Sequence, residues 1–187
     1  MNIEKAALAM GDFLEALDID LDKHGMEKTP LRVAKMYARL FEGVGANTKE
    51  IWGETFEGGD GMVAVRRLPF YSVCEHHLVP FFGEIDIVYL PTDGKIAGFS
   101  KFTKLIEVLS HRPQLQERLT GEIADAVYND LSAKGVLVVV SAKQLCMTIK
   151  RELAHNARTL TSALRGSFQT NENLSREAWR LLGKEKS

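Results

Sequence analysis

The fold is best inferred from one segment, which reads Leu68-Pro69-Phe70-Tyr71-Ser72-Val73-Cys74-Glu75-His76-His77-Leu78-Val79-Pro80-Phe81-Phe82. Both ends are apolar and strand-like, and the centre places a thiol and two imidazoles within four positions. Cys74 and His77 offer two ligands separated by a tight turn, and the later Cys146 can supply a third. Three ligands of this type leave one tetrahedral position of Zn²⁺ for water, as in a catalytic site. Two scattered cysteines alone would favour buried thiols, but the paired histidines and strand-like flanks favour a metal site.

Apolar and polar residues alternate on both sides of this motif. The alternation predicts strands over residues 63–73 and 82–90, and in the second strand Ile85, Ile87 and Tyr89 share one face. An aliphatic run predicts a buried strand over residues 135–140, and a further strand is predicted over residues 158–168. The histidine-rich motif therefore lies near a strand end, where loops usually carry the chemistry.

The remaining segments have helical spacing. Helices are predicted over residues 3–17, 99–109, 114–131 and 172–182, and another begins where Thr29 can cap and Pro30 suits the first helical position. Gly58-Gly59-Asp60-Gly61 marks a boundary between an N-terminal helical part, residues 1–57, and a second domain, residues 58–187. The order of these elements predicts an α+β fold with an antiparallel sheet.

Composition limits the classes of partner. The chain has 187 residues, of which 45% are apolar, enough to close one good-sized core. Its 24 basic and 25 acidic side chains give a formal charge of −1, so neither nucleic acid nor a membrane is an expected partner. No apolar run approaches the roughly 18 residues of a membrane span, and the N-terminus lacks a signal-peptide core. We therefore expect a cytoplasmic protein whose cysteines are reduced thiols or metal ligands.

Two further groups of residues suit a purine nucleotide. Glu117 lies at a predicted helix start, and a carboxylate accepts two parallel hydrogen bonds, which matches the N1–H and N2–H₂ edge of guanine. Pairing of Glu117 with Arg118 near the helix start explains the acid equally well by itself. Ser100, Lys101 and Lys104 offer a hydroxyl, a helix N-terminus and two amines for a phosphate group, although such a group is more often a solvated helix face.

Taken together, the motifs resemble those of the GTP cyclohydrolase I family. The matching segments, in order and at family spacing, are Thr29-Pro30, Arg32-Val33-Ala34-Lys35-Met36, Cys74-Glu75-His76-His77, Pro80-Phe81, Tyr89-Leu90-Pro91, Gly98-Phe99-Ser100-Lys101, Gln116-Glu117-Arg118-Leu119-Thr120, Cys146-Met147 and Thr161-Ser162. The resemblance covers nearly the whole chain. It implies a tunnelling fold, in which helices lie on one face of an antiparallel sheet. It also implies a ring-shaped homodecamer with active sites between subunits.

The resemblance further implies roles for single residues. It assigns Zn²⁺ to Cys74, His77 and Cys146, proton transfer to His76, and guanine recognition to Glu117 with Gln116 nearby. It assigns the triphosphate pocket to Ser100, Lys101, Lys104, Arg32 and Lys150. The implied reaction hydrolyses the imidazole ring of GTP at C8, releases formate, and closes 7,8-dihydroneopterin triphosphate.

Three positions of this chain depart from the family pattern. Gln144 stands where the family has a catalytic histidine two residues before its second cysteine, and an amide does not shuttle protons near neutral pH. Lys104 and Lys150 stand in place of two arginines, which keeps the charge but loses the bidentate fork. Arg151 is a candidate to substitute for its neighbour.

These departures leave several outcomes open. The family reaction can run to completion if His155 or a water relay replaces the missing imidazole. Alternatively, the reaction stops at the ring-opened formamidopyrimidine nucleotide. Two other classes are a non-catalytic ring that binds guanine nucleotides and a different tunnelling-fold enzyme that acts on a related purine or pterin.

Overall fold

The computed structural model describes residues 1–149 and 157–183, which belong to two compact units, residues 1–42 and residues 43–187. In the first unit, α1 (Ile3–Glu15) and α2 (Thr29–Leu40) pack against each other. Asn2 caps α1, because its side-chain oxygen accepts a hydrogen bond of 2.9 Å from the Lys5 amide.

Two predicted details of the helical unit are wrong. Thr29 is the first residue of α2 and not its cap, since Lys28 occupies the capping position without a side-chain hydrogen bond. Pro30 is buried in the first turn, where its missing N–H costs nothing. The first helix ends at Glu15 and not at residue 17, and Asp18 then takes a left-handed conformation with φ of 58°.

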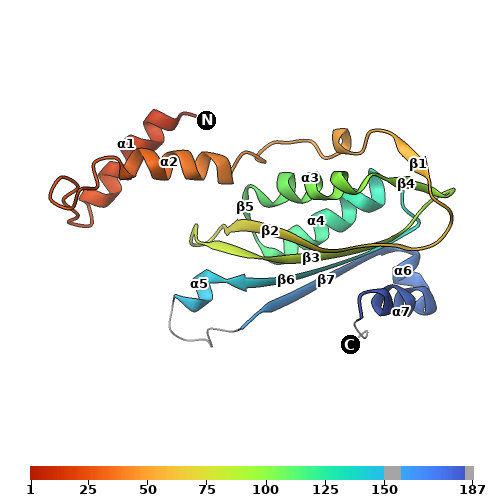
Figure 1. Cartoon of the computed structure of the whole chain (residues 1–187). Helices are drawn as coiled ribbons and strands as arrows, with labels where there is room; N and C mark the ends of the chain where they lie inside the picture. Colours follow the sequence, from red (N-terminus) through yellow and green to blue (C-terminus); the bar gives the residue numbers. More distant parts are fainter. Residues whose placement is uncertain (150–156, 184–187) are drawn as a thin grey trace. The chain divides into compact units, whose positions relative to one another are not determined.

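A five-stranded sheet forms the centre of the second unit (Figure 1). Its strands, in order across the sheet, are β5 (Pro113–Gln114), β2 (Val63–Cys74), β3 (Pro80–Leu90), β6 (Gly135–Gln144) and β7 (Thr159–Gly166). The pairing of β5 with β2 is parallel, and the other pairings are antiparallel. A separate two-stranded sheet pairs β1 (Thr55–Glu57) with β4 (Lys95–Ala97). The predicted α+β class is confirmed.

Helices α3 (Phe99–Ser110) and α4 (Gln116–Asn129) lie on one face of this sheet (Figure 1). Ile85, Ile87 and Tyr89 are fully buried in the core that these helices close, as the alternating pattern predicted. Ile51, at the end of the short 3₁₀ helix η1 (Lys49–Ile51), and Trp52 join the same core, so this part of residues 43–57 packs within the second unit.

The opposite face of the sheet also carries helices, which corrects the expectation of helices on one face only. Val88 and Leu137 face a second cluster that contains Phe168 and Trp179, from α6 (Ser167–Thr170) and α7 (Glu172–Leu181). The chain crosses to this face at Gly166, whose φ is 59°. A Cβ there would lie 2.3 Å from a backbone oxygen of Lys134, so only glycine fits this turn.

Two boundaries differ from prediction in ways that shape the site. The helix predicted over residues 114–131 begins at Gln116, because Pro113 and Gln114 pair with Val73 and Cys74 as β5. The strand predicted over residues 135–140 continues to Gln144. The end of β2, the start of β3 and the end of β6 therefore lie together at one end of the sheet, beside the start of α4.

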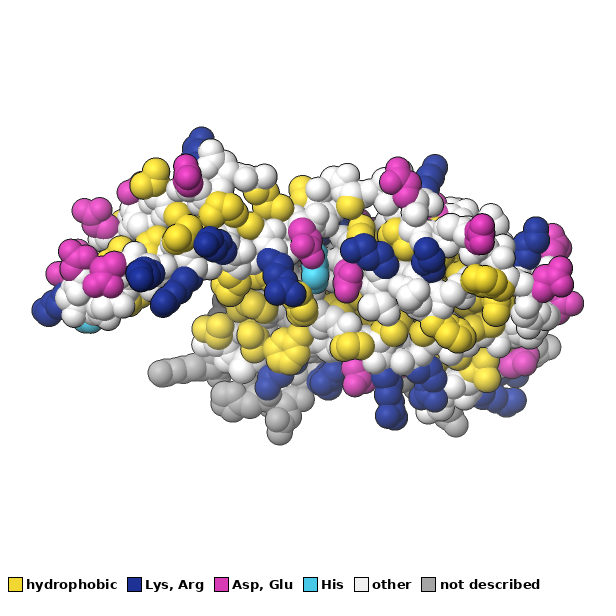
Figure 2. All heavy atoms as spheres, turned by 45° about the horizontal axis from the view of Figure 1, so that its top comes forward, with side chains coloured by type: hydrophobic (Ala, Val, Ile, Leu, Met, Phe, Trp, Pro, Cys, Tyr) yellow, Lys and Arg dark blue, Asp and Glu magenta, His cyan; other side chains and the backbone are white. Residues whose placement is uncertain are grey.

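The face of the molecule drawn in Figure 2 carries side chains of both charges. Basic and acidic side chains are interspersed on the face that Figure 2 shows, which agrees with the formal charge of −1. Over the described residues, no helix has both the length and the apolar character needed to cross a bilayer.

Candidate active site

Three potential metal ligands meet at this end of the sheet. Cys74 ends β2, His77 lies in the turn that follows, and Cys146 lies in the short helix α5 (Leu145–Thr148) after β6. Their ligand atoms all lie within 4.8 Å of one another. Two sulfurs and one imidazole are a donor set that suits Zn²⁺, so these residues fit the metal that the motif predicted. Burial and the neighbouring Cys74 raise the pKa of the Cys146 thiol above its ordinary value.

Backbone hydrogen bonds fold the turn that presents the histidines. The Cys74 amide donates to the carbonyl oxygen of Val79 at 2.9 Å, and the Leu78 amide donates to the carbonyl oxygen of Cys74 at 2.8 Å. Leu78 adopts a left-handed conformation with φ of 52°, which closes the turn. His76 and His77 are both exposed, with ring centroids 6.3 Å apart. The turn therefore carries one histidine toward the two cysteines and a second one beside it.

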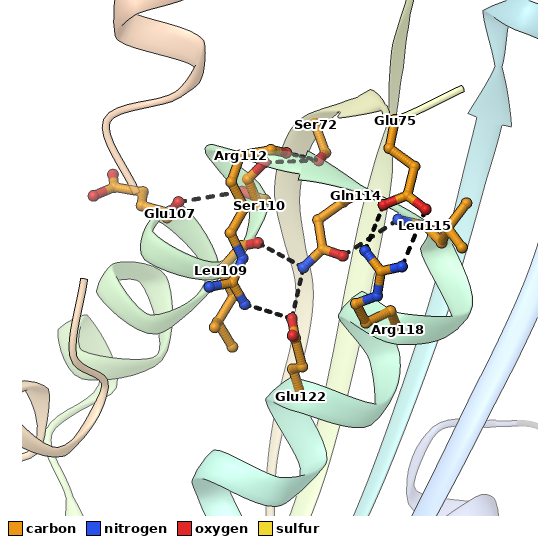
Figure 3. A network of polar contacts seen from close by, with 10 residues as sticks. All are labelled: Ser72, Glu75, Glu107, Leu109, Ser110, Arg112, Gln114, Leu115, Arg118 and Glu122. Carbon is orange, nitrogen blue, oxygen red and sulfur yellow. Dashed lines mark hydrogen bonds and ion pairs between the residues drawn. The ribbon is translucent and has the colours of Figure 1, made fainter. Parts of the chain in front are cut away.

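An ion pair connects this turn to the start of α4. Arg118 donates hydrogen bonds of 2.5 and 3.1 Å from its two terminal nitrogens to the two carboxylate oxygens of Glu75 (Figure 3). These hydrogen bonds lower the pKa of Glu75 below its ordinary value of 4.5. Because the pKa of Glu75 is lower in the folded state, the ion pair stabilises the fold at neutral pH. This stabilisation is lost as the pH falls through the lowered pKa.

A second set of polar contacts holds the segment between α3 and α4. Gln114 is buried, and its side-chain amide donates to the Leu109 carbonyl oxygen at 3.1 Å and to Glu122 at 2.6 Å (Figure 3). Arg112 donates to the same Glu122 carboxylate at 2.5 Å. The Gln114 carbonyl oxygen accepts from the Glu75 amide at 3.1 Å, so this set supports the turn of the metal motif. The sequence offers no local signal for these contacts, since they join separate elements.

Gln116 and Gln144 lie in direct contact. The Gln144 side-chain amide donates to Oε1 of Gln116 at 2.7 Å. Gln116 is 3% exposed, and its Nε2 lies within hydrogen-bonding distance of the Val140 carbonyl oxygen, the Thr159 carbonyl oxygen and the Thr161 hydroxyl. Gln144 stands where the family pattern has a histidine. Its side chain is therefore hydrogen-bonded to Gln116, the residue that precedes Glu117.

Glu117 is exposed in the first turn of α4. The alternative explanation of this acid was a pairing with Arg118, but the guanidinium of Arg118 is engaged by Glu75. Neighbouring residues on a helix do not face each other, which explains why Arg118 turns away from Glu117. The Glu117 carboxylate is thus presented to solvent, one residue from the contact between Gln116 and Gln144.

The sequence matches the family model described as GTP cyclohydrolase I over residues 6–183. This chain belongs to the GTP cyclohydrolase I family. It is 45% identical over 186 residues to "GTP cyclohydrolase 1" of Streptococcus pyogenes serotype M3, covering 99% of this chain and 96% of that protein. It is 43% identical over 180 residues to "GTP cyclohydrolase 1" of Clostridium perfringens, covering 96% of this chain and 97% of that protein. The predicted family resemblance is confirmed.

In this GTP cyclohydrolase I family member, the strand that ends at the candidate metal ligand Cys74 and the expected phosphate-binding residues lie at opposite ends of α3. The carbonyl oxygen of Ser110, at the end of α3, accepts a hydrogen bond of 2.7 Å from Ser72, two residues before Cys74. Ser100 and Lys101 lie in the first turn of α3, beside β4 (Figure 1). Ten residues of helix between Ser100 and Ser110 span about 15 Å. The two groups are therefore separated by about the length of α3 within one chain.

The other expected substrate ligands lie on different elements of the chain. Lys104 is exposed, and its ammonium group lies 3.4 Å from the Glu107 carboxylate within the same helix. Arg32 is exposed on α2 of the first unit. Three predicted positions, Lys150, Arg151 and His155, lie outside the described residues.

Proposed function

We propose that this protein hydrolyses GTP in the reaction that gives its family its name, with zinc bound by Cys74, His77 and Cys146. One observation carries the proposal: three zinc-type ligands converge beside the helix start that presents Glu117. The reaction adds water at C8 of guanine, opens the imidazole ring, releases formate and forms 7,8-dihydroneopterin triphosphate.

The three ligands would hold the zinc ion and so define where a water nucleophile is activated. When bound, zinc lowers the pKa of a coordinated water to about 7, which makes a nucleophile available at neutral pH. His76 follows Glu75 in the same turn, and its Nε2 lies 3.9 Å from that carboxylate. In the proposed mechanism, His76 moves protons at the ring nitrogen next to C8, and Glu75 steadies the turn through Arg118.

Glu117 is the proposed guanine-binding residue. Its carboxylate has no hydrogen bond or ion pair with another described residue, and Arg118 beside it is already engaged. A free carboxylate at this position can accept both the N1–H and the N2–H₂ of guanine, whereas adenine lacks this pair of donors. We therefore propose that the substrate is GTP or a related guanine nucleotide.

The triphosphate is proposed to bind across a subunit boundary. Ser100 and Lys101 lie at the start of α3, whereas the strand that ends at Cys74 contacts the other end of this helix. We propose that a neighbouring copy supplies Ser100, Lys101 and Lys104, with Arg32 and Lys150 as further phosphate ligands. The family resemblance suggests a ring of ten subunits. A homo-oligomer of this kind has the same interface repeated around a closed ring.

The main alternative is a reaction that stops after ring opening, because Gln144 replaces the catalytic histidine of the family. Loss of a general acid or base typically lowers a rate by about 10²–10⁴-fold, and an amide does not provide this function. Ring opening at C8 proceeds in this alternative, but the later steps are slow, and the product is the ring-opened formamidopyrimidine nucleotide.

The free state of Cys74 and Cys146 fits the cytoplasmic location that we also propose.

Mass spectrometry of GTP incubated with the zinc-loaded protein tests the proposal. Formate together with a pterin triphosphate indicates the complete reaction. A product one water heavier than GTP indicates that the reaction stops after ring opening. Unchanged GTP that nevertheless binds tightly would identify a non-catalytic nucleotide-binding ring and reject both forms of the proposal. Turnover of another purine or pterin in place of GTP would identify a different enzyme of the same fold.

A further inference from the structure

We infer that Gln116 is a positioning residue that fixes the side chain of residue 144. In this orientation, the hydrogen-bond donor of residue 144 faces Gln116, and the acceptor of residue 144 faces the reacting centre. The inference rests on the proposed function, because it assigns Gln116 and Gln144 their parts in that reaction. It also gives Gln116 a different role from a direct contact with guanine.

The orientation of the Gln116 amide follows from its neighbours. Its Nε2 lies 3.1 Å from the Val140 carbonyl oxygen and 3.0 Å from the Thr159 carbonyl oxygen. Carbonyl oxygens only accept hydrogen bonds, so the atom that faces them must be the NH₂ group. Rotating the amide by 180° would place Oε1 against two other oxygens at a buried position, which is costly.

Two threonines strengthen this orientation. The Thr120 hydroxyl donates to the Gln116 backbone carbonyl oxygen at 2.7 Å, and it lies 2.7 Å from the Thr161 hydroxyl. Each hydroxyl has one proton, so if Thr120 donates to Gln116, Thr161 must donate to Thr120. Thr161 then uses its lone pair to accept from Nε2 of Gln116 at 3.1 Å. The donor and acceptor directions in this group are therefore consistent, with the two protons of the Gln116 NH₂ group shared among three acceptors.

The fixed amide determines what residue 144 must do. Oε1 of Gln116 can only accept, so its partner at 2.7 Å on Gln144 must be the NH₂ group. No described residue makes a hydrogen bond to Oε1 of Gln144, which leaves this acceptor for the reacting water or substrate. Gln144 ends β6, two residues before Cys146, and so lies next to the metal ligands. It can orient a proton there but not carry one away.

The same arrangement predicts the behaviour of a histidine at this position. A neutral imidazole has one N–H and one lone pair. Facing Oε1 of Gln116, it must turn its N–H toward Gln116, and its lone pair is then left for the reacting centre. Gln116 would thus hold an introduced imidazole as a base in a single tautomer.

Solid-state ¹⁵N NMR of histidine-labelled, zinc-loaded Gln144→His tests the inference directly. The unsubstituted protein, with its five histidines, supplies the reference spectrum. We expect one tautomer for the introduced imidazole, and a mixture of tautomers when Gln116→Asn is added, because the shorter amide withdraws the acceptor. A mixture in Gln144→His itself overturns the inference, whether or not the second variant folds. This measurement needs no turnover, so it stands even if the protein does not hydrolyse GTP.

Steady-state kinetics distinguishes a positioning role of Gln116 from direct binding of guanine by Gln116. For a positioning role, Gln116→Asn lowers kcat or the yield of pterin about tenfold or more, while KM for GTP changes less than about twofold. Gln144→His should raise the ratio of pterin to ring-opened nucleotide, and adding Gln116→Asn should reverse that gain. A large rise in KM with unchanged kcat would instead identify Gln116 as a direct guanine ligand. Gln169→Asn, an exposed site on α6, controls for the substitution itself.

Discussion

Arg118 holds Glu75 through both of its terminal nitrogens, at 2.5 and 3.1 Å, and so ties the start of α4 to the residue after Cys74. The two elements carry different halves of the proposed chemistry, since the turn presents metal ligands and α4 presents Glu117. A bidentate contact of this kind fixes orientation as well as distance. Arg118 therefore fixes the turn that carries the proposed metal ligands relative to the start of α4, which carries the proposed guanine ligand Glu117.

Replacing Arg118 with lysine should weaken zinc binding although the charge is kept. Lysine provides a single ammonium group in place of the planar fork, so the turn loses one of its two fixed contacts. We expect the zinc dissociation constant to rise about tenfold, in the lower range for residues that support metal ligands. Competition with a chromophoric chelator measures the change. Arg176→Lys, in an exposed pair with Glu172 on α7, should leave zinc binding as it is. Equal zinc affinity in Arg118→Lys and wild type would contradict the role of the clamp.

Replacing Glu117 with glutamine should impair recognition of guanine and leave the metal alone. The amide turns one of the two acceptors into a donor, so one guanine N–H loses its partner and the charge is lost. The lost hydrogen bond and the loss of charge from the remaining one together cost about 3 kcal/mol, so KM for GTP should rise about 100-fold. Zinc content, measured by elemental analysis, should stay at the wild-type value. Normal affinity for GTP in Glu117→Gln would show that the base is recognised elsewhere.

The parts of the site that could be predicted from sequence are those whose residues lie close together in the chain. Cys74 and His77 belong to one turn, and Glu117 is a helix-start acid whatever the rest of the fold does. The contact between Gln116 and Gln144 joins residues 28 positions apart, and it depends on β6 continuing to Gln144. It also depends on Pro113 and Gln114 forming β5 in place of a first helical turn. Neither feature has a sequence signal of its own.

In the fold, too, features set by neighbouring residues could be predicted and features set by distant contacts could not. The alternation of Ile85, Ile87 and Tyr89 predicted a buried face correctly, because a strand places every second residue on one side. The same pattern does not reveal that α6 and α7 cover the other face. That outcome depends on the turn at Gly166, which a sequence shows only as one glycine among 15. Tertiary contacts between distant segments decide such features.

Substituting Gly83 with alanine should strongly destabilise the second unit. Gly83 lies in β3 opposite Ala142, and a Cβ there would come within 1.9 Å of the Ser141 carbonyl oxygen. A backbone oxygen in a sheet does not move aside, so we expect a loss of about 3 kcal/mol or more. Chemical denaturation measures the change in midpoint. Gly61→Ala provides the matched control, since a Cβ at Gly61 meets no atom within 4 Å. A Gly83→Ala protein with the wild-type midpoint would contradict this packing.

Zinc affinity should increase with pH. Burial and the adjacent Cys74 raise the pKa of the Cys146 thiol, so in the metal-free protein this thiol is protonated at neutral pH. Zinc must displace that proton, and each displaced proton makes the association constant rise about tenfold per pH unit. Chelator competition at several pH values between about 6 and 8 gives the slope. In Cys146→Asp, whose carboxylate is already ionised, the slope should fall by about one. An unchanged slope would mean that Cys146 does not release a proton to zinc.

Two inactive variants should restore activity when they assemble together. Ser110, at the end of α3, is bonded to Ser72 near Cys74, whereas Lys101 lies about 14 Å away in the first turn of the helix. If a neighbouring subunit supplies Lys101, random co-assembly of Cys146→Ser with Lys101→Ala creates sites with both groups intact. About one quarter of the sites should then be complete, and GTP turnover should recover to roughly that fraction of wild type. Co-assembly of Cys146→Ser with Cys74→Ser, which damage the same half of the site, should recover nothing. If the first pair also stays inactive, although mass spectrometry shows mixed oligomers, each site must be built within a single chain.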